Sequence, residues 1–513
     1  MSDHYDAVIV GSGFGGSICA LRLAQAGRSV LVLERGRRYR PADFPRDPRR
    51  VNDLLWRFPG VGKSTGLYDL RFLSGIGVVV ASGVGGGSLI YAGVHIRPDA
   101  EVFATWPAGI RRTDLEPYFD RVATALDLAP LPSGLGLRKR DAFRAAAELT
   151  GRRVFDPPMA IAWSPPPGSP SQPCALIAEC EFGCPKGAKK TVDVMYLHEA
   201  ETLGAAVVTG ALASHIEAAR GGFRVHYREV ATGREMAVTG GRVVLAAGTL
   251  GTNELLLRSR DLFRTLPALS PRLGFGFSGN GDFIGTVHDC TVDVDPWNGP
   301  DVTSVMRYDE PPQFTLAAPT FAAAVMRVIA RASAPPPSWL RTARGWLWPR
   351  LGTAIALALR FRLWRFLPQV SATAPRRTTN LFAIGRDSAG GRVVLRGGRL
   401  DVVWKYGQEN QHLVRRMIAA MEATARVYGG RYVPAPTWTM FERILSVHPL
   451  GGCALSRDRE SGVVSVDGEI HGYPGLFVAD GSVVPTALGF HPAMTIAALA
   501  ERTAECVVRS YSQ

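Results

Sequence analysis

The sequence has few cysteines and no apolar run at its start. Seven cysteines in 513 residues form a sparse, odd-numbered set, which argues against a secreted scaffold built on disulfides. The first six residues contain neither a cationic nor an apolar segment, so no secretory signal is predicted and we expect a cytoplasmic protein. No basic stretch is interleaved with aromatic residues, so nucleic acid is not an expected partner.

Glycine, proline and arginine are plentiful instead. The chain holds 56 glycines and 36 prolines and carries a formal net charge of +14. A composition of 46% hydrophobic and 20% charged residues fits a folded protein with two or more domains. The positive charge suits an anionic ligand or surface, and it equally suits an arginine-rich surface that only keeps the protein soluble.

The N-terminal segment has the arrangement of a dinucleotide-binding unit. A buried strand is predicted over Tyr5–Val10, a helix over Ser17–Gly27 and a second strand over Ser29–Leu33, which Glu34 follows. A Gly-x-Gly-x-x-Gly motif joins the first strand to the helix, with its glycines at Gly11, Gly13 and Gly16. Such glycines allow a tight turn and let a pyrophosphate approach the helix N-terminus, while the acid accepts hydrogen bonds from ribose hydroxyls.

A second glycine-rich segment, Gly83–Ser88, indicates a long cofactor held by several loops. Glycines there would let the backbone lie against a flat ring. The alternative is a flexible loop.

Two histidines near the C-terminus, His448 and His491, each precede a proline. A neutral histidine, with an ordinary pKa of about 6.5, suits the acceptance of a proton near neutral pH. We assign His448 as the base and His491 as its partner, which binds an alkoxide-like oxygen, and the two roles are interchangeable at this stage. The alternative is a pair of buried histidines bonded to backbone.

Together these residues make the chain resemble the glucose–methanol–choline (GMC) flavoprotein oxidoreductases, and within them the bacterial branch around cholesterol oxidase. The matching motifs follow the family's order over nearly the whole chain, and the weakest stretch is 295–375. They are Gly11–Gly16 with Glu34, Gly83–Leu89, Lys189–Leu197, Ala246–Thr252, His448–Cys453, Asp480–Ser482 and His491–Arg502.

The resemblance implies an α/β fold with a Rossmann-like FAD-binding domain built from several segments. It also implies a substrate domain with an antiparallel sheet and covering helices. We place the FAD-binding domain at 1–285 and 434–513, with inserted helical and loop segments near 100–185, and the substrate-binding domain at 286–433. Long alternating or helical patterns over 286–295, 392–404 and 410–428 fit the second domain.

The resemblance further implies FAD and the oxidation of an alcohol by hydride transfer to flavin N5. The catalytic residues would be His448 and His491. The residues expected to bind the cofactor are Gly11, Gly13, Phe14, Gly15, Gly16, Glu34, Arg35, Gly85, Gly86, Gly87, Ser88, Tyr91, Ala92, Val94, Ala213, Ala247, Gly248, Asp480, Gly481, His491, Pro492 and Ala493.

Two departures bear on the substrate. The family has either a histidine or an asparagine at the position of His491. Cholesterol oxidases resemble the asparagine version, whereas this chain has the histidine. They also carry a glutamate that isomerises the steroid, in a segment similar to Phe314–Pro319, where this chain has Leu316 or Ala317. An apolar residue cannot shuttle a proton, so sterol isomerisation is not expected. We expect a hydrophobic, lipid- or sterol-like alcohol, and the electron acceptor is oxygen or another molecule.

Two other segments allow more than one interpretation. The run Cys174-x5-Cys180-x3-Cys184 has no standard ligand spacing, so we expect structural thiols and no metal, with an iron–sulfur or zinc site as the alternative. Residues 339–367 combine tryptophans and arginines without an acid, which suits either a lid in peripheral contact with a membrane or a helical cover on the substrate domain. The apolar run inside that segment is too short to span a bilayer, which takes about 20 residues.

Three rival functions remain. The same chemistry on a polar, sugar-like or natural-product alcohol needs only a different pocket. A non-oxidoreductase flavin enzyme, such as a light-driven decarboxylase or a lyase, would not require the histidine pair. A degenerate FAD-binding protein would not require the full set of motifs.

Overall fold

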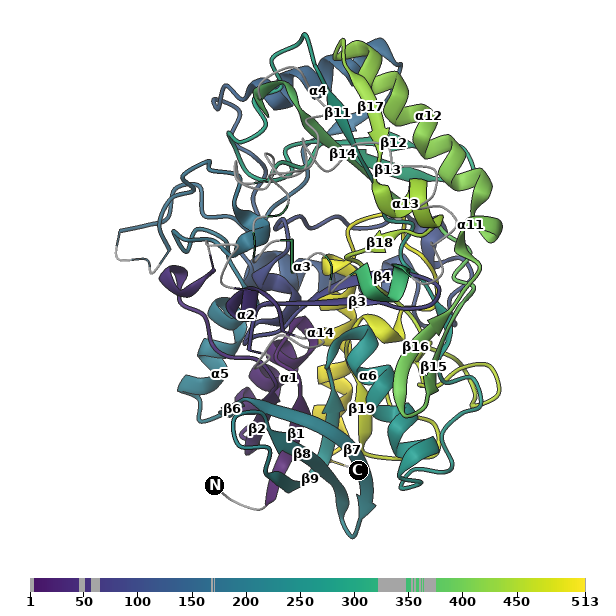
Figure 1. Cartoon of the computed structure of the whole chain (residues 1–513). Coiled ribbons are helices and arrows are strands. Elements are labelled where there is room, and N and C mark those ends of the chain that lie inside the picture. Colours follow the sequence, from purple (N-terminus) through teal and green to yellow (C-terminus); the bar gives the residue numbers. More distant parts are fainter. Residues whose placement is uncertain are drawn as a thin grey trace.

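The structure is a computed structural model that describes residues 4–45, 51–56, 65–167, 169, 171–321 and 375–512, with a few positions between 347 and 363. The described chain has two main sheets, one near the termini and one at the opposite end of the molecule (Figure 1). Helices cover both sheets, and shorter strands lie between them (Figure 1).

The sheet near the termini is parallel at its centre. β1 (His4–Val10) lies between β2 (Val30–Glu34) and β9 (Glu235–Leu245) and is parallel to both. β6 (Ala206–Thr209) continues the parallel order beyond β2, and β19 (Leu476–Val478) pairs with the C-terminal end of β9. All five residues of β2 are buried, as expected for a strand whose two faces are both covered.

The same sheet gains an antiparallel extension. β7 (Ala211–Ala219) and β8 (Gly222–Glu229) form a hairpin that pairs with the first half of β9. On one face, α1 (Phe14–Gln25) packs against the C-terminal helix α14 (Ala493–Arg509), which in turn contacts α3 (Arg112–Ala125). A helix from each end of the chain therefore packs in the same layer, next to the Gly11–Gly16 turn from which α1 begins.

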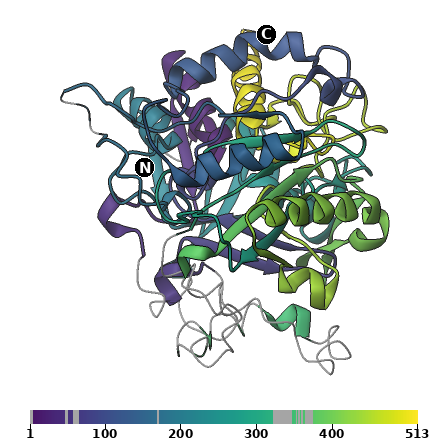
Figure 2. The same cartoon turned by 90° about the horizontal axis from the view of Figure 1, so that it is seen from above.

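The second sheet is antiparallel throughout, and its strands follow the order β17-β11-β14-β13-β12-β5. Their bounds are β5 Val154–Phe155, β11 Phe283–His288, β12 Val305–Tyr308, β13 Phe314–Ala317, β14 Thr379–Gly385 and β17 Arg431–Pro434. The amphipathic helix α12 (Gln411–Val427) covers it, with Leu413, Met417 and Met421 among its buried residues. Figure 2 shows this helix along one side of the molecule.

Smaller sheets connect the two ends. One contains β3 (Tyr68–Phe72), β4 (Gly77–Ala81) and β18 (Leu445–Ser446). The other contains β10 (Phe275–Phe277), β15 (Gly391–Arg396) and β16 (Arg399–Val403). The remaining helices include α2 (Val51–Leu54), α4 (Arg138–Leu149), α5 (His198–Thr202), α6 (Gly248–Leu257), α11 (Tyr406–Glu409) and α13 (Pro436–Phe441).

The expected antiparallel sheet with a covering helix is confirmed, and two local predictions are wrong. The strand expected to run to 295 ends at His288, because Asp289 adopts a left-handed φ of 59° that breaks the extended backbone. The single pattern over 392–404 is a hairpin, β15 (Gly391–Arg396) and β16 (Arg399–Val403). It turns at Gly397–Gly398, which both have positive φ, and it lies outside the six-stranded sheet.

The domain division stays a prediction. β11 begins and β17 ends close to the expected limits of 286 and 433. β5, from the segment inserted near 100–185, adds an edge strand to the antiparallel sheet.

Candidate active site

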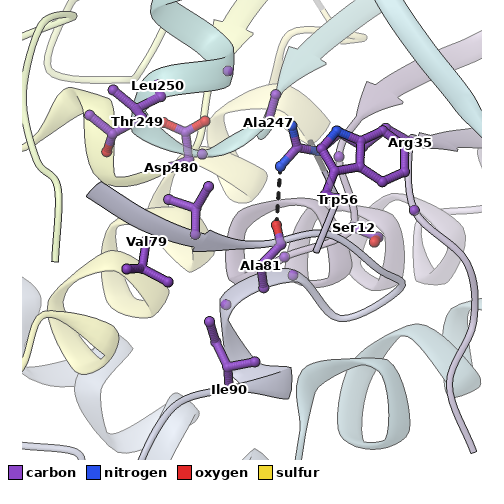
Figure 3. A pocket seen from close by; sticks show the side chains of 18 of the residues that line it. Ser12, Arg35, Trp56, Val79, Ala81, Ile90, Ala247, Thr249, Leu250 and Asp480 are labelled. Carbon is purple, nitrogen blue, oxygen red and sulfur yellow. Dashed lines mark hydrogen bonds between the residues drawn. The ribbon is translucent and has the colours of Figure 1, made fainter. Parts of the chain in front are cut away.

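A large cavity of about 1400 Å³ runs between the two main sheets. Its wall includes every residue predicted for the site except Gly16, Gly85 and Ser88. Figure 3 shows part of it, with Ser12 and Arg35 on one side and Thr249, Leu250 and Asp480 on the other. Segments more than 400 residues apart in sequence thus meet around one volume.

The glycines of the first turn allow backbone segments to touch. Gly11 has a φ of +98°, and a Cβ there would stand 2.3 Å from the Ala246 carbonyl oxygen. A Cβ on Gly15 would lie 1.7 Å from the carbonyl oxygen of Ala479. The turn therefore packs directly on the ends of the two strands that follow it in the sheet, β9 and β19. Gly16 also allows a close backbone contact in this turn, but it does not line the cavity.

Glu34 is fixed by the turn that it faces. Its Oε2 accepts hydrogen bonds from the backbone N–H and the hydroxyl of Ser12 at 3.1 and 2.6 Å, and its Oε1 accepts one from Gly36 N–H at 2.8 Å. The carboxylate is buried and reaches the cavity wall. Oε1, with a single donor, retains acceptor capacity, which suits a ribose hydroxyl.

The second glycine segment lies on the first. A Cβ on Gly86 would approach the Gly13 Cα to 2.6 Å, and Gly85 N–H donates to the Ser12 hydroxyl at 3.2 Å. The Ser88 hydroxyl, by contrast, accepts from Val192 N–H at 3.1 Å and faces away from the cavity. Gly85 and Ser88 therefore shape the loop without lining the wall.

An ion-pair group missed by the sequence reasoning supports Arg35. Its guanidinium donates to Asp69 at 2.9 Å and to the Ala81 carbonyl at 3.3 Å, and it lies 5.2 Å from the Trp56 ring centroid (Figure 3). Arg71, 8% exposed, bridges Asp69 to Glu254. No sequence motif marks these residues, because Asp69 and Arg71 on β3 meet Arg35 after β2 and Glu254 on α6 only in the folded chain.

Asp480 orders the turn after β19. Its carboxylate accepts from Ser482 N–H at 2.9 Å, from the Ser482 hydroxyl at 2.6 Å and from the Thr252 hydroxyl at 2.5 Å. Burial raises its pKa, and these donors oppose the rise. The carboxylate thereby joins the 480–482 turn to α6 at the cavity wall.

His448 is oriented by a buried aspartate. Asp282 Oδ1 lies 2.8 Å from His448 Nδ1, and the Asp282 side chain is fully buried. Oδ2 accepts from the backbone N–H groups of Val447 and His448 at 2.8 and 3.1 Å and from the Ser446 hydroxyl at 3.1 Å. With Nδ1–H donating to the carboxylate, Nε2 keeps its lone pair and is the ring's proton acceptor.

The segment before His491 is held from the same turn. Asn280 accepts from Leu488 N–H and Gly489 N–H at 2.8 and 3.1 Å, and its amide donates to the Phe490 carbonyl at 2.8 Å. Asn280 and Asp282 thus position the two histidine-bearing segments. The sequence signal for these two residues is a polar turn with alternating glycines, Ser278–Asp282, just before a strand. It was not identified from the sequence as part of the site.

The two histidine rings stand edge to face, with centroids 5.6 Å apart. His491 is 7% exposed, and its Nδ1 has no hydrogen-bond partner among the described residues. Burial, with the neighbouring His448 and His95, lowers the pKa of His491 well below its ordinary value. The ring is therefore neutral near pH 7.

The family is decided by comparison with known proteins. The GMC oxidoreductase models match at residues 5–260 for the N-terminal part and 391–500 for the C-terminal part. The chain belongs to the GMC oxidoreductase family.

Individual relatives agree with this membership. The chain is 27% identical to a cholesterol oxidase of Acinetobacter baumannii, with 97% of this chain and 93% of that one covered. It is 29% identical to a cholesterol oxidase of Mycobacterium tuberculosis, with 98% and 91% covered. A long-chain-alcohol oxidase of Arabidopsis thaliana is 24% identical over 98% of this chain and 66% of its own length. A fungal aryl-alcohol oxidase shares the fold, with a TM-score of 0.62, 17% identity and complete coverage of both chains.

As a GMC oxidoreductase the protein is a flavoprotein that oxidises alcohols, and its cofactor is FAD. The cavity fits that cofactor. Ser12–Phe14, at the N-terminus of α1, lines the cavity together with Glu34, and a pyrophosphate is stabilised by such a helix end. Backbone glycines on both loops leave room for the cofactor to approach closely.

The three clustered cysteines are free thiols, and among the described residues no group of histidines, cysteines and acids is arranged to hold a metal. Burial raises the pKa of Cys180 to about 12, so this thiol stays protonated.

Most of the segment 339–367, including Trp339, Trp346 and Trp364, lies outside the described residues. Trp348 is described and is buried: its indole N–H donates to the Leu73 carbonyl at 2.6 Å and its ring meets Phe72 edge to face. Trp348 is therefore an internal anchor and unavailable to a membrane. In the described part of the chain, no helix has the length and apolarity needed to cross a membrane.

Proposed function

We propose that this protein oxidises a largely apolar alcohol to the carbonyl compound, with His448 as the general base and His491 as the hydrogen-bond donor to the reacting oxygen. The observation that carries the proposal is the geometry of His448, whose ring is oriented by the buried Asp282 and opens onto the cavity.

Bound FAD supplies a two-electron acceptor for the carbinol hydride. The chain's own residues deal with the hydroxyl proton and the oxygen. Nε2 of His448 accepts the proton, and the Asp282 carboxylate then stabilises the imidazolium that results. His491, neutral and 5.6 Å away between ring centroids, donates a hydrogen bond to the oxygen as negative charge develops there.

The cavity wall beyond the histidines supports an apolar substrate. It is formed by side chains of the antiparallel sheet and its flanking segments, namely Ile284, Val302, Pro319, Phe321, Phe382 and Val447. Phe382 lies 5.9 Å from His448 between ring centroids. Burial of apolar surface contributes roughly 25 cal/mol per Å², so a lipid-like chain gains far more here than a sugar does.

The relatives named above include oxidases of sterols and of long-chain alcohols. Leu316 and Ala317 are both buried on β13, in the segment where we expect the steroid-isomerising glutamate of the cholesterol oxidases. This favours simple alcohol oxidation over oxidation coupled to isomerisation. Oxygen is the proposed electron acceptor.

The test is anaerobic mixing of the yellow holoprotein with sterols, long-chain alcohols and sugars. We expect flavin bleaching with the apolar alcohols and not with the sugars, and recovery of the yellow colour on admission of air. Bleaching by sugars alone would reject the apolar substrate. Turnover that requires light and no alcohol would reject alcohol oxidation.

A further inference from the structure

A carboxyl group that the alcohol oxidation does not use lines the cavity. It belongs to Glu181, on a loop that pairs with residues before Val302. Ala178 N–H donates to the Gly299 carbonyl at 3.0 Å, and Gly299 N–H donates to the Leu176 carbonyl at 2.9 Å. This pairing brings Glu181 against the fully buried Asp301.

Each carboxyl group shifts the pKa of the other, and a hydrogen bond between the two side chains contributes to both shifts. Oδ1 of Asp301 accepts from Thr320 N–H at 2.9 Å, whereas Oδ2 receives no N–H or hydroxyl donor from the described residues. Two carboxylates are acceptors only, so the contact between them needs one proton. Burial raises the pKa of both groups, which keeps that proton in place.

Two buried lysines lie beside the pair, but their ammonium groups donate hydrogen bonds to other oxygens. Lys139 Nζ donates to the Asp301 carbonyl at 3.0 Å and to the Thr320 hydroxyl at 2.7 Å. Lys189 Nζ donates to the carbonyls of Leu89 and Tyr91 at 2.8 and 3.0 Å. Two positive charges therefore lie beside the single negative charge of the pair, so the group has no net attraction for a cationic ligand.

The pair borders the substrate end of the cavity. Thr320, which bonds to Asp301, lies between Pro319 and Phe321, and both of these line the wall, as does Val302. Glu181 is half-buried and lines this volume. With one proton held between the two carboxyl groups, Glu181 keeps an oxygen that can accept a hydrogen bond at the cavity wall.

We propose that Glu181, held by Asp301, accepts a hydrogen bond from a second hydroxyl group of the substrate, so that the preferred substrates are apolar alcohols with a hydroxyl at the far end. This inference rests on the proposed alcohol oxidation and refines its substrate class. Glu181 is a specificity residue here and moves no proton in the reaction.

The test uses alkan-1-ols of 6 to 16 carbons, the α,ω-diols of the same lengths, and ω-methoxy-alkan-1-ols, whose ether oxygen accepts but cannot donate. A hydrogen bond worth about 1.4 kcal/mol gives about a tenfold preference. At the chain length that spans the distance from His448 to Glu181, kcat/KM for the diol should exceed that for the mono-alcohol about tenfold. This preference comes in addition to the factor of two that the diol gains because either of its ends can react. The methoxy alcohol should show no such preference. Equal use of diol and methoxy alcohol at every length would overturn the proposal with no variant needed.

Two variants sharpen the result. In Glu181→Gln the amide donates to Asp301 and the amide oxygen still faces the cavity, so the diol preference should survive within about threefold. Glu181→Leu should lose the preference yet oxidise the mono-alcohols like the parent, with an unchanged flavin spectrum. A Glu181→Gln protein that loses kcat on mono-alcohols would show a proton-transfer role and contradict the proposal. Failure of every alcohol to bleach the flavin would instead reject the underlying alcohol oxidation.

Discussion

Asp282 accepts a hydrogen bond from the Nδ1 of His448 at 2.8 Å, and the carboxylate that makes it is fully buried. The contact fixes the tautomer of the ring, and three further donors fix the carboxylate. A histidine beside Pro449 on a tight turn thereby becomes a pre-oriented base, and its orientation depends on a residue 166 positions earlier in the chain.

Replacement of Asp282 by Asn should impair proton transfer more than folding. The amide cannot accept from all of the backbone N–H groups and the ring, so His448 loses its fixed tautomer. We expect the rate of flavin reduction by alcohol to fall about 10²–10⁴-fold, with FAD retained. Stopped-flow absorbance measures this, and Asp261→Asn, at an exposed surface position, is the control. A wild-type rate in Asp282→Asn would remove Asp282 from the mechanism.

His491 should tolerate a neutral hydrogen-bonding replacement better than an apolar one. His491→Asn keeps an N–H donor, whereas His491→Leu has none, and the loss of such a donor costs about 10²–10³-fold in rate. Because the pKa of His491 lies well below 6.5, the ring is neutral above that pH. The pH–rate profiles of the parent and His491→Asn should therefore have the same shape between pH 6.5 and 9. An inflection that disappears only in His491→Asn would show that His491 titrates there.

Gly13→Ala should weaken FAD binding without disturbing the apoprotein. A Cβ at Gly13 meets nothing closer than the Gly86 Cα at 3.8 Å, so the protein accommodates it, but the methyl group projects where the cofactor must approach. We expect FAD affinity to fall by about 10–100-fold, equivalent to about 1.4–2.7 kcal/mol. Equilibrium titration of the apoprotein measures the affinity, and the apoprotein melting temperature serves as the folding check.

Gly136→Ala is the matched control for that substitution, since a Cβ there has no neighbour within 4 Å and the residue is away from the cavity. If Gly13→Ala bound FAD as tightly as Gly136→Ala, the first glycine turn would not contact the cofactor.

Stability should fall on mild acidification through His215. Its ring is stacked between Phe263 and His226, with centroid distances of 3.8 and 4.1 Å. Burial, followed by the neighbouring His226, lowers the pKa of His215 to about 4. The unfolded chain, with a histidine pKa of about 6.5, then binds the proton more readily, so this stability contribution is present above pH 6.5 and lost as pH falls toward 4.

The check is the melting temperature of His215→Phe and the parent at pH 7 and pH 4.5. The phenylalanine keeps the stack and cannot be protonated, so the variant should lose less stability on acidification. An equal drop in both proteins would assign the acid sensitivity to other groups.

The N-terminal βαβ unit was predictable because its strand, glycine turn, helix and acid are contiguous in the sequence. β1, α1 and β2 follow that pattern with shifts of a few residues. The resemblance to the GMC family also pointed to His448 and His491, and most of the cofactor residues that it implied do line the cavity. Local pattern and motif order carried these predictions.

Contacts between distant segments were beyond such reasoning. Asp282 and Asn280 reach segments 166 and about 210 residues away, and nothing local marks either as a partner of the histidines. Glu181 and Asp301 form a pair only because residues 176–178 bridge to Gly299. The strand beyond His288 was overpredicted because alternation of residue types does not reveal the left-handed Asp289.

Alcohol oxidation with His448 as the base is tested most directly by anaerobic reduction of the flavin. The holoprotein and His448→Asn are mixed anaerobically with a long-chain alcohol and with its 1,1-dideuterated form. We expect fast bleaching of the parent, slower bleaching with deuterium because the carbinol C–H bond breaks, and a variant that stays yellow with its reduction slowed about 10²–10⁴-fold. Bleaching of His448→Asn at the parent's rate would contradict the assignment of His448 as the base.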